Sequence, residues 1–148
     1  MKLDDALKGI TLIALDTAPL IYFVERHLEY AERMRSIIRR IDSGQIMSFS
    51  SVITLTEVLT LPKRVGNRSL EREYSELLLN SRNFSLVDVN PEIAENAAEL
   101  RARYNLRTPD ALQIASAIVT GCQAFITNDT VFKRVNELSI LVLSELEL

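Results

Sequence analysis

The segment Thr11-Leu-Ile-Ala-Leu15 is a short apolar run that ends directly before an acidic residue, Asp16. A run of this length and composition is typical of a strand with both faces buried, and strands of that kind form parallel sheets covered by helices. Four further runs have the same character, and we expect additional strands at residues 46–49, 84–87, 124–127 and 140–143.

The segments between these runs carry the signals of helices. Apolar residues recur at helical spacing from Leu28 to Ile41, and Gly44 is placed to end that helix. Asn90-Pro91 and Thr108-Pro109 each combine a capping residue with proline at the first helical position. Further helices are expected at residues 17–25, 51–61, 70–78 and 130–136.

Strands that alternate with helices require crossover connections, which favour a mainly parallel sheet. The sequence therefore predicts an α/β fold, a three-layer α/β/α sandwich with about five strands. The length of 148 residues suits a single domain that spans residues 1–148. In open sheets of this kind the ligand site is expected at the carboxyl ends of the strands.

The composition argues against several classes of protein. The net charge of −3 disfavours nucleic-acid binding through a broad basic surface, although it allows an enzyme whose positive charge comes from bound metal. The only cysteine, Cys122, cannot form a disulfide within the chain, and no apolar run approaches the ~20 residues of a membrane span. The first ten residues lack a secretory pattern, so we expect a cytoplasmic protein without membrane contact.

Two acidic residues, Asp16 and Asp129, follow predicted strands. Both are expected at the sheet edge where sites form. A purely local role is the alternative for each. Asp16 could cap the helix that begins at Thr17, and Asp129 could serve as a turn or cap residue.

Glu57 lies in a helix that is expected to begin at Ser50 or Ser51 and to end before Pro62. Apolar residues occur nearly all round this helix, which predicts that it is largely buried. A buried glutamate is costly unless it is paired, hydrogen-bonded or bound to metal. The alternative is that Glu57 belongs to a narrow solvent-facing stripe with Thr54 and Thr60.

Asp110 lies in the first turn of a helix that offers little polar surface. An acid at this position stabilises the helix dipole without any catalytic role. Gln113 follows three residues later and shares its face of the helix. Because the few polar residues of this helix form one stripe, the stripe could face a site.

The four acids Asp16, Glu57, Asp110 and Asp129 would meet if the two helices approach the strand ends. Two carboxylates 4 Å apart repel by about 4 kcal/mol at an effective dielectric near 20, so four of them must take up protons or bind cations. Carboxylate oxygens suit Mg²⁺ or Mn²⁺ rather than Zn²⁺, and such ions support phosphodiester hydrolysis. The only histidine, His27, has no partner for a zinc site and is read as a surface residue.

Four pieces of sequence resemble the PIN-domain nucleases, and among them the VapC-like toxins of toxin–antitoxin pairs. The resemblance covers nearly the whole chain, and its pieces are Leu15-Asp-Thr-Ala-Pro-Leu-Ile-Tyr22, Thr54-Leu-Thr-Glu-Val-Leu59, Thr108-Pro-Asp-Ala-Leu-Gln-Ile-Ala115 and Phe125-Ile-Thr-Asn-Asp-Thr-Val-Phe132. It implies a Mg²⁺- or Mn²⁺-dependent endoribonuclease, usually a homodimer, whose site is blocked by a small antitoxin protein.

The resemblance also implies roles for individual residues. The four acids match the acidic ligands of the family, and Thr127 matches a hydroxyl residue that supports the last of them. Two positions depart from the family pattern. Ala18 stands where many relatives have a small polar residue, and Val131 stands where many have a further acid, so a second metal ion has one ligand fewer.

Arg107 is the basic residue closest in sequence to a predicted ligand, and it could contact an RNA phosphate. A solvated surface charge is the alternative. Two other functions stay open for the whole chain: a PIN-like protein-interaction module with little or no activity, and a housekeeping RNA-processing or DNA-cleaving nuclease that uses the same acids.

Overall fold

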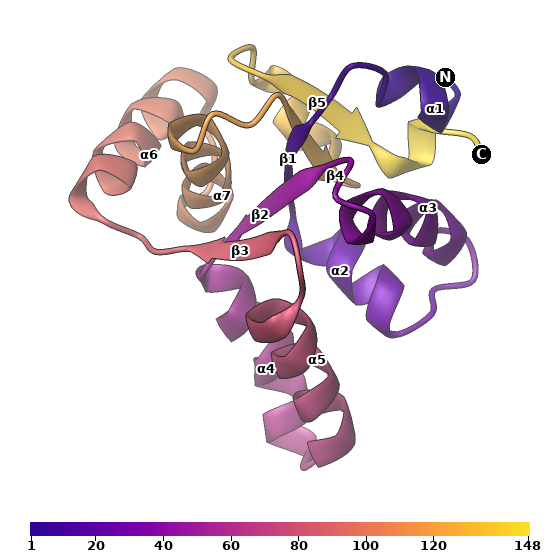
Figure 1. Ribbon diagram of the computed structural model, residues 1–148. Helices are drawn as coiled ribbons and strands as arrows, with labels where there is room; N and C mark the ends of the chain where they lie inside the picture. Colours follow the sequence, from indigo (N-terminus) through magenta and orange to yellow (C-terminus); the bar gives the residue numbers. More distant parts are fainter.

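The computed structural model describes residues 1–148 and has a sheet of five strands at its centre (Figure 1). The strand order is β3-β2-β1-β4-β5, and every neighbouring pair is parallel. The strands are β1 (Leu12–Leu15), β2 (Met47–Ser51), β3 (Phe84–Val87), β4 (Ala124–Thr127) and β5 (Ser139–Val142). The predicted parallel five-stranded sheet is therefore confirmed.

Helices connect the strands and lie on both sides of the sheet (Figure 1). Those between β1 and β3 are α2 (Thr17–Val24), α3 (Ala31–Asp42), α4 (Ile53–Val65) and α5 (Arg68–Asn80). The others are α1 (Leu3–Ala6), α6 (Pro91–Tyr104), α7 (Thr108–Val119) and two 3-10 turns, η1 (Thr130–Arg134) and η2 (Leu143–Glu145). None of the helices combines the length and the apolar character that a membrane span requires.

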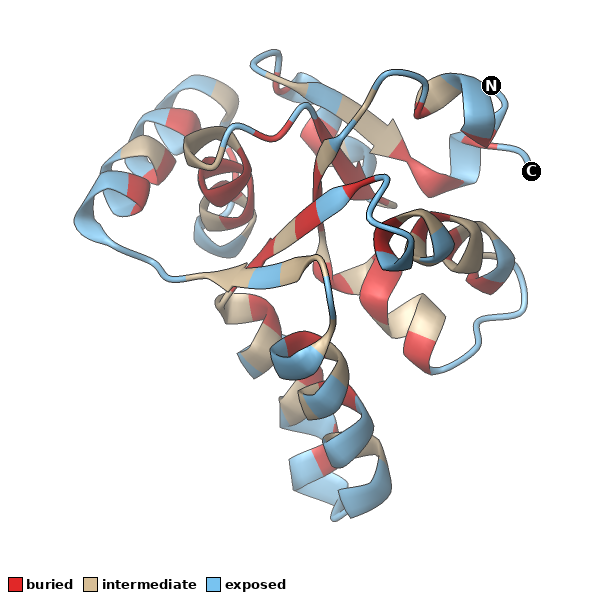
Figure 2. Ribbon diagram, in the orientation of Figure 1, coloured by how far each residue is buried: buried red, intermediate tan, exposed pale blue.

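Alternation along β1 divides the core into two clusters. Ile13 and Leu15 pack with buried residues of α2 and α3, whereas Ala14 packs with those of α6 and α7. Successive side chains of a strand point to opposite faces, so one short strand contributes to both clusters. Figure 2 shows the result, with buried residues along the central strands and on the helix faces turned toward them. This arrangement confirms the predicted α/β/α sandwich.

Helix α4 differs from the prediction in its length and its burial. It continues through Pro62 to Val65 and ends at Gly66, whose φ of +71° suits a residue without a side chain. Proline removes one backbone hydrogen bond, but Pro62 is buried and lies in the last turns, where the loss is tolerated. Helices α4 and α5 form a hairpin that extends away from the sheet (Figure 1), so much of α4 is exposed rather than buried.

Candidate functional site

Asp16 lies at the carboxyl end of β1, where a site residue is expected, and it also caps α2. Its Oδ1 accepts a hydrogen bond from the backbone N–H of Thr17 at 2.8 Å, and its Oδ2 accepts one from the Thr127 hydroxyl at 2.8 Å. Burial raises the pKa of Asp16 to about 6, although these two hydrogen bonds oppose the shift. The charges of Asp110 and Glu57 raise the pKa further, which places both carboxylates within electrostatic reach.

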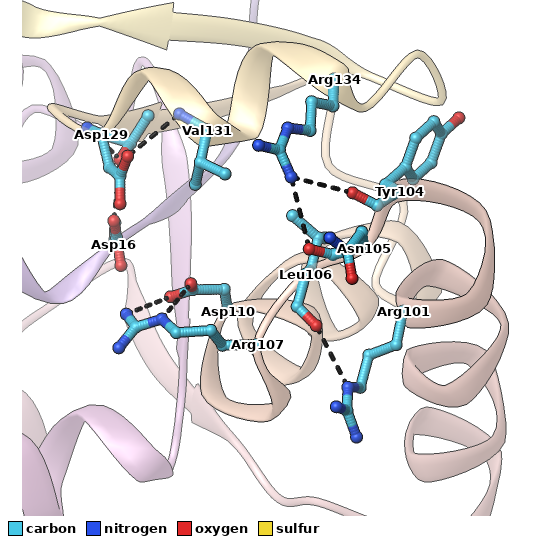
Figure 3. Close-up of polar contacts among 11 residues, drawn as sticks. Asp16, Arg101, Tyr104, Asn105, Leu106, Arg107, Asp110, Asp129, Val131 and Arg134 are labelled. Atoms are coloured by element: carbon cyan, nitrogen blue, oxygen red, sulfur yellow. Dashed lines mark hydrogen bonds and ion pairs between the residues drawn. The ribbon is translucent and has the colours of Figure 1, made fainter.

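Asp129 follows β4 by two residues and is exposed. Its Oδ1 accepts from the backbone N–H of Val131 at 3.0 Å and so caps η1. Its own N–H donates to the Thr127 hydroxyl at 3.0 Å. Buried Thr127 thereby connects Asp129 to Asp16, and Figure 3 shows the two carboxylates pointing toward one another. The adjacent strands β1 and β4 bring these two acids together.

Glu57 is exposed, and the prediction that its helix is largely buried is wrong. Thr56 and Thr60 share its solvent-facing surface, whereas Thr54 faces inward and is fully buried. The Glu57 carboxylate nevertheless turns toward α2, because its Oε1 accepts a hydrogen bond from the Thr17 hydroxyl at 2.9 Å. Since Thr17 directly follows Asp16, this hydrogen bond holds the Glu57 carboxylate near the start of α2.

Asp110 lies in the first turn of α7 and forms a two-point ion pair with Arg107. The Nε–Oδ2 and Nη2–Oδ1 distances are 3.0 and 3.3 Å. The hydrogen bond to Asp110 raises the pKa of Arg107, followed by the charges of Asp110, Asp129 and Glu57. Arg107 therefore stands in the electrostatic field of the other acids, with 77% of its side chain exposed.

Two further arginines hold the loop that leads to Arg107 (Figure 3). Arg101 donates from Nε to the carbonyl oxygen of Leu106, and Arg134 donates from Nη1 to the carbonyl oxygens of Tyr104 and Asn105. These contacts fix the entry to α7. Arg101 and Arg134 are thus structural parts of the site's border.

The arrangement is looser than the predicted crowding of four ionised acids. No three of the carboxylates are close enough to enclose a metal ion as they stand. Their repulsion is reduced by the Arg107 cation, which forms an ion pair with Asp110. Burial, more than the neighbouring charges, raises the pKa of Asp16 to about 6. The donor set consists of carboxylate and hydroxyl oxygens, which are the ligands that Mg²⁺ and Mn²⁺ prefer.

Three buried polar residues at this site received little weight in the sequence analysis. Thr17, Thr54 and Gln113 form a hydrogen-bonded cluster behind Glu57. The stripe shared by Asp110 and Gln113 was a usable signal for the last of them, whereas nothing local distinguishes the two threonines. His27 is exposed, as predicted, and Val131 offers only a backbone N–H at the position of the missing acid.

Comparison with known protein families identifies the class to which this chain belongs. The sequence model of the PIN domain family matches residues 13–138. The chain belongs to the PIN domain family, which confirms the resemblance drawn from the four motifs.

Solved structures show the same fold in components of toxin–antitoxin complexes. VapBC2 from Rickettsia felis, bound to a DNA fragment from its promoter, matches with a TM-score of 0.72 and 17% identity over 88% of this chain and 97% of that one. DNA-bound VapBC from Salmonella typhimurium matches with a TM-score of 0.68 and 18% identity over 90% and 99%. A toxin–antitoxin complex from Klebsiella pneumoniae matches with a TM-score of 0.63 and 22% identity over 88% of this chain and 97% of that one. No curated protein matches the chain by sequence.

Proposed function

We propose that this protein is a metal-dependent endoribonuclease that hydrolyses RNA phosphodiester bonds as the toxin of a toxin–antitoxin pair. The observation that carries the proposal is that Glu57, Asp110 and Asp129 lie within electrostatic reach of Asp16 or of Arg107, near the carboxyl ends of β1 and β4. Membership of the PIN domain family and the fold shared with toxin–antitoxin complexes support it.

The four acids would hold one or two ions of Mg²⁺ or Mn²⁺. Such an ion, when bound, activates water and stabilises the negative charge on the attacked phosphate. Thr127 and the start of α2 fix both oxygens of the Asp16 carboxylate. Asp129 and Glu57 contribute exposed carboxylates.

Arg107 has two roles in this proposal. In the metal-free protein it neutralises Asp110, with which it forms its ion pair. When RNA enters, the largely exposed guanidinium can turn to a phosphate oxygen, for which its planar donor pair is equally suited. The acidic chain thus presents positive charge to RNA at the site itself rather than over a broad surface.

The partners follow from the same proposal. A small antitoxin protein would cover the site, and two copies of the chain would form a homodimer. The presence of both components in the structurally similar complexes supports an antitoxin partner. A gene for a small protein next to this one would favour the toxin role, whereas its absence would favour a housekeeping RNA-processing or DNA-cleaving nuclease.

A cleavage assay with three proteins tests the reaction. Wild type is expected to cleave RNA with Mn²⁺ and to lose activity in EDTA, and Asp16→Asn is expected to be inactive with Mn²⁺. Asp5→Asn is the matched control, because Asp5 is an exposed acid of α1 that precedes β1 and lies outside the acidic cluster. Cleavage that persists in EDTA or in Asp16→Asn contradicts the mechanism. Full biological effect of Asp16→Asn would indicate a protein-interaction module instead.

A further inference from the structure

A buried polar cluster joins the three helices that are associated with the predicted ligands. Thr17 belongs to α2, which Asp16 caps; Thr54 belongs to α4 with Glu57; and Gln113 belongs to α7 with Asp110. The exposed fractions of the three residues are 9%, 0% and 3%. Their hydrogen bonds are therefore shielded from water, and each joins two helices that sequence places far apart.

The hydrogen bonds of this cluster run in one direction. The Thr17 hydroxyl donates its only proton to Glu57 Oε1 at 2.9 Å, so it must accept from the Thr54 hydroxyl at 3.0 Å. The Thr54 oxygen in turn accepts from Gln113 Nε2 at 2.8 Å. Every donor in the chain of bonds thus points toward the Glu57 carboxylate.

The amide of Gln113 is oriented by that carboxylate. Its Nε2 lies 3.4 Å from Glu57 Oε1 and 3.2 Å from the Thr17 hydroxyl, whereas its Oε1 is buried without any partner. An unpaired buried oxygen is unfavourable, because it has lost its hydrogen bonds to water without gaining others. Exchanging the two amide atoms would bring the oxygen against the negative Glu57 carboxylate, which is less favourable still. The unpaired oxygen is accordingly the consequence of aiming an N–H at Glu57.

We infer that Gln113 is a positioning residue that sets the place and the orientation of the Glu57 carboxylate through Thr54 and Thr17. Gln113 couples α7 to α4 and α2. It thereby fixes the spacing of Asp110 on α7, Glu57 on α4 and Asp16 at the start of α2. Its interior position sets it apart from Arg107, which meets Asp110 at the surface. This inference rests on the proposed function, because the carboxylate is positioned for a metal ion.

Metal affinity is the property that tests the inference. Gln113→Met keeps the length and volume of the side chain but removes the amide, and we expect the Kd for Mn²⁺, measured by calorimetry, to rise by about 10-fold or more. Ser116→Ala is the matched control. Ser116 is buried one turn further along α7 and donates only to the Leu112 carbonyl oxygen of its own helix, so the Kd should stay within about twofold.

A second pair of variants tests the chain of hydroxyls. Thr54→Val removes the hydroxyl and keeps the shape, and it should weaken Mn²⁺ binding as Gln113→Met does. Thr54→Ser retains the hydroxyl and should bind with the affinity of wild type. This pair decides the matter if Gln113→Met fails to fold. Thermal unfolding in EDTA separates stability from positioning, because a merely structural role would lower Tm in Gln113→Met and Thr54→Val without changing the Kd.

The possible outcomes separate the inference from the proposed function. Wild type that binds Mn²⁺, with variants that bind equally well, overturns the inference alone. Wild type that does not bind Mn²⁺ overturns the proposed metal centre and the inference with it. Weak binding confined to Gln113→Met and Thr54→Val supports both.

Discussion

Replacing Asp16 by asparagine should stabilise the metal-free protein at neutral pH. Asp16 carries a pKa raised from 3.8 to about 6, mainly by burial, so at pH 7.5 the fold contains a carboxylate that is ionised at a cost. A shift of this size corresponds to roughly 3 kcal/mol. Asparagine removes the charge but loses an acceptor for Thr127 or Thr17, which costs about 1 kcal/mol. The expected net gain is therefore about 2 kcal/mol.

The dependence on pH gives this prediction its sign. Because the folded pKa lies above the unfolded one, the stability linked to Asp16 is complete below pH 3.8 and is lost as the pH rises through about 6. The advantage of Asp16→Asn should thus be absent at pH 4 and should develop between pH 4 and 7. With Mn²⁺ bound, wild type should become more stable than Asp16→Asn. Mn²⁺ at 100 times its Kd stabilises wild type by about 2.7 kcal/mol, and it is not expected to bind the variant.

Urea unfolding in EDTA at pH 4.0, 6.0 and 7.5 measures the difference in the free energy of unfolding between Asp16→Asn and wild type. In thermal unfolding, a gain of about 2 kcal/mol corresponds to a rise in Tm of about 4–8 °C for a chain of this length. Asp129→Asn is the control. The Asp129 carboxylate is exposed and asparagine can still cap η1, so its stability should change by no more than about 0.5 kcal/mol. A lower stability of Asp16→Asn than of wild type at pH 7.5 would refute the electrostatic reasoning.

Three further substitutions have expected outcomes. Arg107→Ala should tighten Mn²⁺ binding, because it frees Asp110 from its ion pair. It should also lower the salt dependence of RNA binding by about one phosphate contact. An unchanged salt dependence would show that Arg107 does not contact RNA. Thr127→Val should raise the pKa of Asp16 further, seen as a shift of its carboxyl NMR titration to higher pH, since the hydroxyl bond opposes the shift. Tyr74→Phe should lower the free energy of unfolding, measured in urea, by about 1 kcal/mol, because the Tyr74 hydroxyl donates a hydrogen bond to the side-chain carboxylate of Glu25, the residue that follows α2. An equal urea midpoint would show that this hydrogen bond contributes nothing.

The fold was largely predictable from the sequence, because its strands and helices follow from local patterns. The apolar run at residues 11–15 indicated a strand buried on both faces, and the proline-containing starts of α6 and α7 were read from Asn90-Pro91 and Thr108-Pro109. Pro62 misled the prediction because the cost of a missing hydrogen bond is local, whereas the burial that offsets it arises only in the α4–α5 hairpin.

The candidate site divides in the same way. The sequence alone determined which acids follow strands or begin helices, since parallel strands deliver their carboxyl ends to one edge. Tertiary structure alone decided how the negative charge is accommodated: Arg107 on Asp110, the proton affinity of Asp16, and the hydroxyls and amide that face Glu57. Charge, burial and hydrogen-bond direction depend on distances between residues remote in the chain, and no local pattern encodes those distances.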